Sequence, residues 1–297
     1  MKQSISVAIA TFNEEENIGS CLDTVRQLAD EIVVVDGSSQ DDTVAIAKKH
    51  GAQVIVTDNP PIFHINKQKA LDACRREWIL QLDADERVTK KLAEEIKMIV
   101  SLSDEAIERY QGRLLNKNLF QRHQRVIEKR DGKIGKTEGE YAGFFVPRLN
   151  YFLGKYLRYG GVYPDGVIRL VKNGKAHFPC RSVHEQIVIN GRIGWLQNDL
   201  IHMADPTFKR YLERNSRYID LIATDLKKAR AKKTPIQFLE YFLIKPVYWF
   251  FLTLFRHKGI FDGFQGVVFS FFSALRFPRA YWRYLFRKDI KDDESCD

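Results

Sequence analysis

The chain has 297 residues, of which 44% are hydrophobic and 29% charged, so it can bury a sizeable core and is not a disordered chain. Its net charge of +9 is uneven: residues 1–206 hold 29 basic and 28 acidic side chains, whereas residues 207–297 hold 18 and 10. The four cysteines lack the spacing of a zinc site or a redox motif, and the N-terminus lacks the pattern of a signal peptide. We therefore expect a cytoplasmic protein with reduced thiols.

Strand and helix patterns alternate over the first hundred residues. Helical patterns separate four apolar runs typical of buried strands, at residues 5–10, 31–36, 53–57 and 78–83. The first helix is expected to start at Asn13 as N-cap and to bury one face, made of Ile18, Cys21, Leu22, Val25 and Leu28. This alternation predicts an α/β fold with right-handed crossovers and a doubly wound, mostly parallel sheet.

Polar side chains follow three of these strands, at residues 11–14, at Asp36, and at Asp83 and Asp85. Because the carboxyl ends of parallel strands share one rim, these side chains are expected to meet there. Two carboxylates one residue apart can hold a divalent cation, and the cation can hold a diphosphate. The alternative is a structural turn in which Asp85 or Glu86 caps the helix that starts near Thr89. Neither a G-x-G-x-x-G run nor a P-loop occurs in the sequence.

A polar and basic segment at about residues 101–140 interrupts this pattern. We interpret it as a helical insertion with a solvated charged face, the alternative being a surface for an anionic acceptor or a membrane. Residues 141–170 then return to strand-like and glycine-rich patterns. We expect the catalytic domain to cover residues 1–205, insertion included.

The last third, residues 206–297, holds 21 of the 36 aromatic residues and most of the excess positive charge. Its two most apolar segments, residues 246–255 and 266–275, have ten residues each and are flanked by basic side chains. A membrane span needs about 20 apolar residues, so we expect amphipathic helices that lie on an anionic membrane surface. The alternative is a helical subdomain packed on the catalytic domain. No nucleic-acid-binding motif accompanies the basic residues.

Three stretches, at residues 10–15, 34–41 and 82–86, are similar in sequence, order and spacing to the signature stretches of family 2 glycosyltransferases. This resemblance implies a GT-A fold over about residues 4–205. Shorter segments more narrowly resemble the bacterial branch that adds glucose or a similar sugar to the lipopolysaccharide core or other envelope glycans; they lie at residues 148–154, 163–165, 169–170 and 183–185.

The resemblance also implies roles for individual residues. The pocket for the base and ribose would be formed by Thr11, Phe12, Glu14 and Asp36. Asp83 would contact the ribose or the metal, and Asp85 would be the direct ligand of a Mg²⁺ or Mn²⁺ ion. Lys67, with Lys69 as a further candidate, would meet the diphosphate; the alternatives are a core position for Phe12 and solvated lysines.

An inverting transfer needs a carboxylate that takes a proton from the acceptor hydroxyl. Glu185 is the first candidate for this base, and Asp165 is the second. His184 would orient the carboxylate or contact phosphate, and Arg181 would stabilise the leaving diphosphate. A hydrogen-bonded structural turn is the alternative for the pair His184-Glu185, as a structural role is for His202, which otherwise would approach the metal or the diphosphate.

The sequence thus predicts an inverting sugar transferase that uses a UDP-sugar and a lipid-linked glycan at the inner face of the cell membrane. One alternative is transfer to a polyprenyl phosphate, which needs no base. Another is a membrane-bound protein that binds sugar nucleotides without turnover. The sequence leaves the donor sugar, the acceptor and the oligomeric state open.

Overall fold

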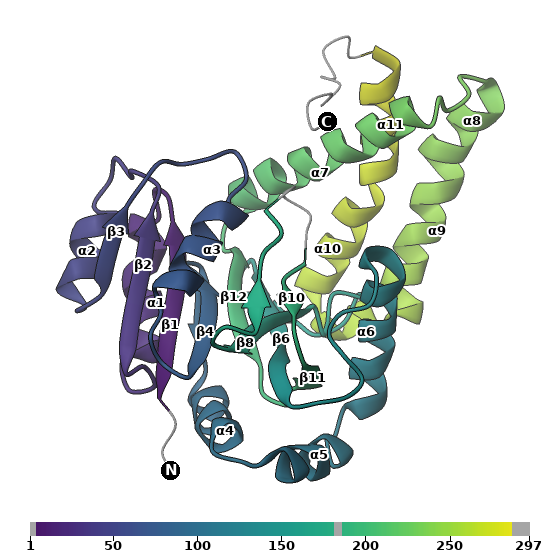
Figure 1. Ribbon diagram of the computed structural model, residues 1–297. Helices are drawn as coiled ribbons and strands as arrows, with labels where there is room; N and C mark the ends of the chain where they lie inside the picture. The colour runs from purple at the N-terminus through teal and green to yellow at the C-terminus, as the bar shows by residue number, and fades with distance from the viewer. Residues whose placement is uncertain (1–3, 181–185, 287–297) are drawn as a thin grey trace. The chain divides into compact units, whose positions relative to one another are not determined.

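The computed structural model describes residues 4–180 and 186–286 (Figure 1). The chain divides into two compact units, which we call the sheet unit and the helical unit. The sheet unit comprises residues 1–149 and 164–202, and the helical unit comprises residues 150–163 and 203–297.

The N-terminal half of the sheet is parallel, as predicted. Its strands lie in the order β3-β2-β1-β4 and have the bounds Gln53–Val56 (β3), Glu31–Asp36 (β2), Ile5–Thr11 (β1) and Trp78–Asp83 (β4). The helices that connect them are α1 (Glu15–Val25), α2 (Thr43–Lys49) and α3 (His64–Ala73). In β1, alternate residues enter different cores: Val7 and Ile9 pack into one and Ala8 into the other. Both faces of the sheet are therefore covered, as a doubly wound fold requires.

The order continues from β4 through β8, β6 and β12 to β5. These strands are β8 (Gly166–Lys172), β6 (Tyr141–Phe152), β12 (Leu200–Asp205) and β5 (Glu86–Val88). β8 is antiparallel to both β4 and β6, so the sheet is mixed beyond its parallel half. β7 (Lys155–Leu157) and β11 (Arg192–Trp195) also pair with β6, while β9 (Ala176–His177) and β10 (Val188–Ile189) form a separate pair.

Three helices follow β5, namely α4 (Lys90–Val100), α5 (Asp104–Gly112) and α6 (Lys117–Asp131). The last two form the segment expected as a helical insertion. α6 is anchored to the core because Phe120 is fully buried and its ring stacks on Trp195 with centroids 4.6 Å apart. Its basic side chains face solvent, so the segment combines a packed face and a solvated face.

One capping prediction and one capping alternative were wrong. Asn13 has a positive φ of 54°, and its Oδ1 accepts a hydrogen bond from the Gln40 backbone N–H, so Glu14 and not Asn13 occupies the N-cap of α1. Thr89 caps α4, with its side chain accepting from the Leu92 backbone N–H. Neither Asp85 nor Glu86 is therefore needed as a cap, and both side chains are available for other roles.

The helical unit contains α7 (Phe208–Lys228), α8 (Pro235–Leu239), α9 (Lys245–Phe251), α10 (Phe264–Ala274) and α11 (Arg276–Phe286). α8 and α9 are parts of one helix, Pro235–Arg256, whose remaining turns are π-helical. This helix has 22 residues, so the expectation of a separate ten-residue segment was wrong. By length and composition alone it is sufficient to cross a membrane.

Candidate active site

A cavity of about 310 Å³ opens at the carboxyl ends of β1 and β4 in the sheet unit. Most of the residues predicted for the nucleotide and metal line it, namely Thr11, Phe12, Glu14, Lys67, Asp83 and Asp85. Asn59, Phe63, Asn66 and His202 belong to the same lining. The fold thus brings together side chains from four segments of the sequence: the ends of β1 and β4, the loop and helix after β3, and strand β12.

Asp83 is held between two cations at this rim. Its Oδ1 lies 2.5 Å from Lys67 Nζ, and its Oδ2 lies 2.5 Å from an Nη of Arg169. Burial alone would raise the pKa of Asp83, but Arg169 and Lys67 outweigh burial and hold it well below its usual range. Burial lowers the pKa of Lys67, and the Asp83 carboxylate opposes that effect. Asp83 is therefore an anion that orients Lys67 in the cavity wall.

Glu86 is completely buried and forms the centre of a charge network. Its Oε2 accepts from the Asp83 backbone N–H at 3.0 Å, and its Oε1 accepts from Arg169 at 2.8 Å. Arg148 approaches the same Oε1 at 3.5 Å. Because a buried carboxylate is costly unless cations and donors surround it, these contacts explain why Glu86 sits in the core. The network fixes the backbone of the acidic turn that carries Asp83 and Asp85.

Arg169 was not assigned a role from the sequence, although its guanidinium contacts Gln81, Asp83 and Glu86 in this network. The register that pairs Leu80 of β4 with Leu170 of β8 places Arg169 beside Gln81. Since side chains two residues apart share a face of a strand, the guanidinium reaches both Gln81 and Asp83. The available signal was a lone arginine inside the apolar run of residues 166–172, because a charge at a buried strand position needs a partner.

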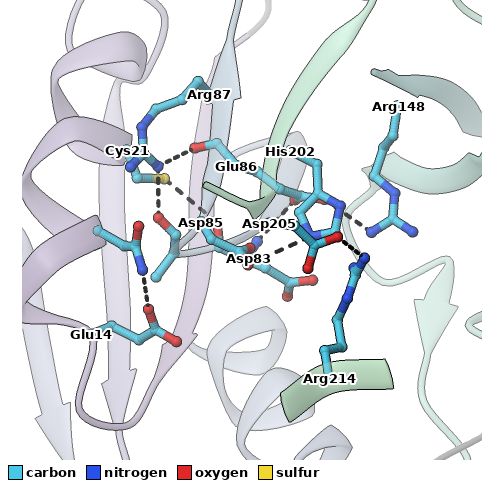
Figure 2. Close-up of polar contacts among 12 residues, drawn as sticks. Glu14, Cys21, Asp83, Asp85, Glu86, Arg87, Arg148, His202, Asp205 and Arg214 are labelled. Atoms are coloured by element: carbon cyan, nitrogen blue, oxygen red, sulfur yellow. Dashed lines mark hydrogen bonds and ion pairs between the residues drawn. The ribbon is translucent and has the colours of Figure 1, made fainter. Parts of the chain in front are cut away.

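Asp85 lies beside a histidine from a different strand (Figure 2). β12 is antiparallel to β5 in a register that pairs His202 with Glu86, and His202 Nε2 is 3.4 Å from Asp85 Oδ2. Both side chains line the cavity and are less than one-fifth exposed. Carboxylate oxygen is a suitable ligand for Mn²⁺ or Mg²⁺, and imidazole nitrogen is a ligand of first-row transition metals, the series to which Mn²⁺ belongs. Within residues 4–180 and 186–286 no third His, Cys, Asp or Glu completes a cluster, so Asp85 and His202 are the candidate cation ligands in that part of the chain.

Asp36 is fully buried and does not line the cavity. Its carboxylate accepts from the Thr11 hydroxyl at 2.9 Å and from the Ser39 backbone N–H at 2.8 Å. The predicted contact between Asp36 and a uracil or ribose stays a prediction, because in this conformation the Asp36 side chain is buried behind Thr11 and Ser39. In it, Asp36 holds Thr11 and the turn after β2 in the wall of the cavity.

Two aromatic rings and the amide of Asn66 also line the cavity. Phe12 and Phe63 are each 44% exposed, so Phe12 is a surface side chain and not a core residue. Asn66 is 5% exposed, and its Nδ2 donates to the Asp58 carbonyl oxygen at 2.9 Å, whereas its Oδ1 is buried without a hydrogen-bond partner. An unpaired buried acceptor is costly, so it indicates a place where a ligand donor fits. Asn66 was missed because its neighbour Lys67 carried the charge signal.

Of the remaining predicted residues, three are not described and two lie off this cavity. Glu185, His184 and Arg181 are outside the described residues, so the predicted base stays a prediction. Asp165 forms an ion pair with Arg148 at 2.9 Å and does not line the donor cavity. Lys69 also lies off the lining and donates to the Thr57 hydroxyl at 2.7 Å.

The Asp83 contacts predict a pH-dependent contribution to stability. Because the folded-state pKa lies below the unfolded value of about 3.9, the unfolded chain binds more protons between the two, and stability falls as pH falls. The contribution is fully present above about pH 5 and is lost toward the folded-state pKa. Urea unfolding of the wild type and Asp83→Asn from pH 7 to pH 3 should show a stability difference that shrinks on acidification. A constant difference would contradict the ion-pair assignment.

Comparison with known proteins identifies the domain that carries this cavity. The model of glycosyl transferase family 2 matches residues 6–150, which include the first three cavity-lining segments and the acidic turn. Residues 6–150 belong to glycosyl transferase family 2. The predicted resemblance is confirmed, and the α/β sheet agrees with the GT-A architecture expected of the family.

Proteins similar to this one match it over nearly its whole length. An uncharacterized glycosyltransferase of Rickettsia felis is 27% identical over 93% of this chain and 88% of its own length. The lipopolysaccharide core biosynthesis glycosyltransferase LpsC of Rhizobium meliloti is 25% identical over 93% of this chain and 92% of its own. Glucosyl-3-phosphoglycerate synthase of Mycobacterium tuberculosis, solved with Mn²⁺ and UDP-glucose, is 28% identical over 29% of this chain and 34% of its own, with a TM-score of 0.27.

Proposed function

We propose that this glycosyltransferase is an inverting enzyme that transfers a hexose, most simply glucose, from a UDP-sugar to a lipid-linked glycan of the cell envelope. The observation that carries the donor assignment is the joint placement of Asp85, His202 and Lys67 around one cavity. A cation ligand pair and a lysine at one rim are complementary to a nucleoside diphosphate, which carries its negative charge between the base and the sugar.

The chain's own residues would act on the donor in distinct ways. Phe12 and Phe63 offer apolar surface to the base at the cavity mouth. Lys67, oriented by Asp83, faces the diphosphate and stabilises the negative charge that grows on it as the glycosidic bond breaks. Asp85 and His202 would hold a divalent cation, which when bound neutralises the leaving diphosphate.

The acceptor hydroxyl needs a base, and Glu185 remains the proposed residue. Its carboxylate would take the hydroxyl proton while the oxygen attacks the anomeric carbon from the side opposite to the diphosphate. Attack from that side converts an α-linked donor into a β-linked product. Asp165 is the weaker candidate, because the ion pair with Arg148 occupies its carboxylate.

The similarity to a lipopolysaccharide core glycosyltransferase over nearly the full chain supports an envelope glycan as acceptor. An apolar stripe on the Pro235–Arg256 helix supports a place at the membrane. The stripe repeats every fourth residue and is about half exposed at each position: Leu239, Leu243, Val247, Phe251 and Phe255. We propose that the helical unit lies peripherally on the inner face of the cell membrane, with basic side chains toward anionic headgroups.

The deciding experiment is a donor screen. Purified full-length protein is incubated with a panel of nucleotide sugars, with and without Mn²⁺, and hydrolysis or transfer is followed by release of the nucleoside diphosphate. Metal-dependent turnover of a UDP-sugar is expected; absence of both turnover and metal-dependent UDP binding would favour a non-catalytic sugar-nucleotide-binding protein. Nearly full transfer by Glu185→Gln would instead favour an acceptor that is already anionic, such as a polyprenyl phosphate.

Asn66 provides a separate test of donor binding. If its free Oδ1 accepts a hydrogen bond from the nucleotide, Asn66→Leu should weaken UDP binding by about 10-fold, the usual cost of about 1–2 kcal/mol for a lost hydrogen bond. Isothermal titration calorimetry with UDP measures the effect. The control Asn173→Leu alters an asparagine that lies off this cavity, and equal affinities for wild type and Asn66→Leu would contradict the assignment.

A further inference from the structure

We propose that the helical unit contains a second anion site, in which a phosphate group binds to Arg276 and Arg279 of α11 beside Arg214 of α7. All of the residues involved lie in the helical unit, so the site shares no residue with the donor cavity of the sheet unit.

Positive charge exceeds negative charge at this place. The charged groups close enough to affect the buried phenol of Tyr211 are Asp205 and three arginines, Arg214, Arg279 and Arg276. Burial raises the pKa of Tyr211 to about 12, with Asp205 adding to that effect and the arginines opposing it. Asp205 pairs with Arg214 (Figure 2), which leaves the other two guanidinium groups without that carboxylate.

Arg276 is a half-buried cation whose guanidinium has no hydrogen-bond acceptor among the residues that the structure describes. Its guanidinium carbon lies 4.2 Å from the ring centroid of Trp249 and 5.0 Å from that of Phe277. Its Nε is buried and has no hydrogen-bond partner, and burial lowers its pKa. Neither Arg276 nor Arg279 forms an ion pair with any residue in the described ranges. A partly buried guanidinium without acceptors is unfavourable unless a ligand supplies them.

Arg283, the next arginine of α11, has acceptors for its guanidinium on α7. Arg283 donates to the Ser216 carbonyl oxygen at 2.8 Å and to the Ser216 hydroxyl at 2.7 Å, and it pairs with Asp220 at 2.9 Å. Residues 276, 279 and 283 follow the spacing of three and four that defines one helix face. α7 thus supplies acceptors for the last arginine of this face but not for the first two.

A phosphate group is the ligand chemistry that fits, because planar guanidinium groups bind phosphate oxygens through paired N–H donors. The phosphate could belong to a lipid headgroup or to a soluble phosphorylated molecule. α11 and the preceding helix α10 expose large apolar side chains, namely Val267 and Phe271 on α10 and Trp282 and Phe286 on α11, which is consistent with a phosphate attached to a lipid.

The test uses the full chain and two probes, inorganic phosphate and phosphatidylcholine vesicles with or without phosphatidic acid. Trp249 fluorescence follows phosphate binding because its ring contacts Arg276, and flotation follows vesicle binding. Arg276→Gln/Arg279→Gln should weaken binding of at least one probe by about 10-fold or more, as expected for lost hydrogen bonds to a charged group. The control Lys209→Gln/Arg217→Gln removes two exposed charges from α7 and should have a markedly smaller effect.

The pattern of losses identifies the source of the phosphate. Weaker binding of phosphatidic acid vesicles alone indicates a lipid headgroup, and weaker binding of inorganic phosphate alone indicates a soluble ligand. If Arg276→Gln/Arg279→Gln binds both probes as tightly as the wild type does, the proposed site does not exist. Thermal melts check folding, and Arg276→Lys/Arg279→Lys, which keeps the charge but removes the paired donors, should also bind more weakly; wild-type binding by this variant would overturn the proposal.

Discussion

Asp85→Asn should lower sugar-transfer turnover by about 10²- to 10³-fold, because it removes the carboxylate that we propose as a direct cation ligand. A Lewis-acid contribution of several kcal/mol to the departure of the diphosphate corresponds to that range. The substitution keeps the size of the side chain and leaves Glu86, the buried centre of the turn, in place. The loss should therefore appear in turnover while the melting temperature changes little.

The measurement is donor turnover as a function of Mn²⁺ concentration. Asp85→Asn should need a higher concentration for half-maximal rate, and His202→Gln should shift the same curve in the same direction, since the two side chains face each other at 3.4 Å. Glu94→Gln is the matched control, because Glu94 is an exposed carboxylate on α4. Wild-type turnover and metal dependence in Asp85→Asn would rule out this residue as a cation ligand.

Arg169→Met should destabilise the sheet unit by about 3–5 kcal/mol, the usual cost of removing one partner from a buried ion pair. The methionine leaves Glu86 fully buried beside only the more distant Arg148, and it frees one oxygen of Asp83. Unfolding in urea measures the effect. Arg130→Met, which breaks an exposed pair with Asp131, is the control and should cost less than about 1 kcal/mol.

A double variant separates the loss of charge from the loss of packing. If Arg169→Met destabilises because Glu86 is left uncompensated, then Glu86→Gln in the same chain should recover part of the lost stability. Additive losses from the two substitutions would show instead that the residues act independently. The double variant should still transfer sugar poorly, because Asp83 and Lys67 lose the arginine that orders them.

Local pattern predicted the parallel half of the fold well. β2 was predicted at its observed bounds, and the expected apolar face of α1, including Ile18, Cys21 and Val25, is buried. These elements follow directly from the spacing of apolar side chains. The caps were harder, because Asn13 and Glu86 take up tertiary contacts that compete with capping. In the last third, the predicted apolar segment covered only residues 246–255 of the helix Pro235–Arg256. It was too short because Glu240 and Lys245 interrupt the apolar pattern, although they pair with each other in the helix.

By itself, the sequence determined that polar residues from Thr11, Asp36 and Asp85 converge at one rim, since strand order and direction follow from the alternation of strands and helices. Only the tertiary structure decided which of them face the cavity. Asp36 turned inward to Thr11 and Ser39, and His202 reached Asp85 through strand pairing across more than a hundred residues. The physical reason is that long-range register sets a side chain's partners, and no local pattern records it. In the acidic turn, Asp85 therefore faces the candidate cation site, Asp83 orders Lys67, and Glu86 is the buried anchor.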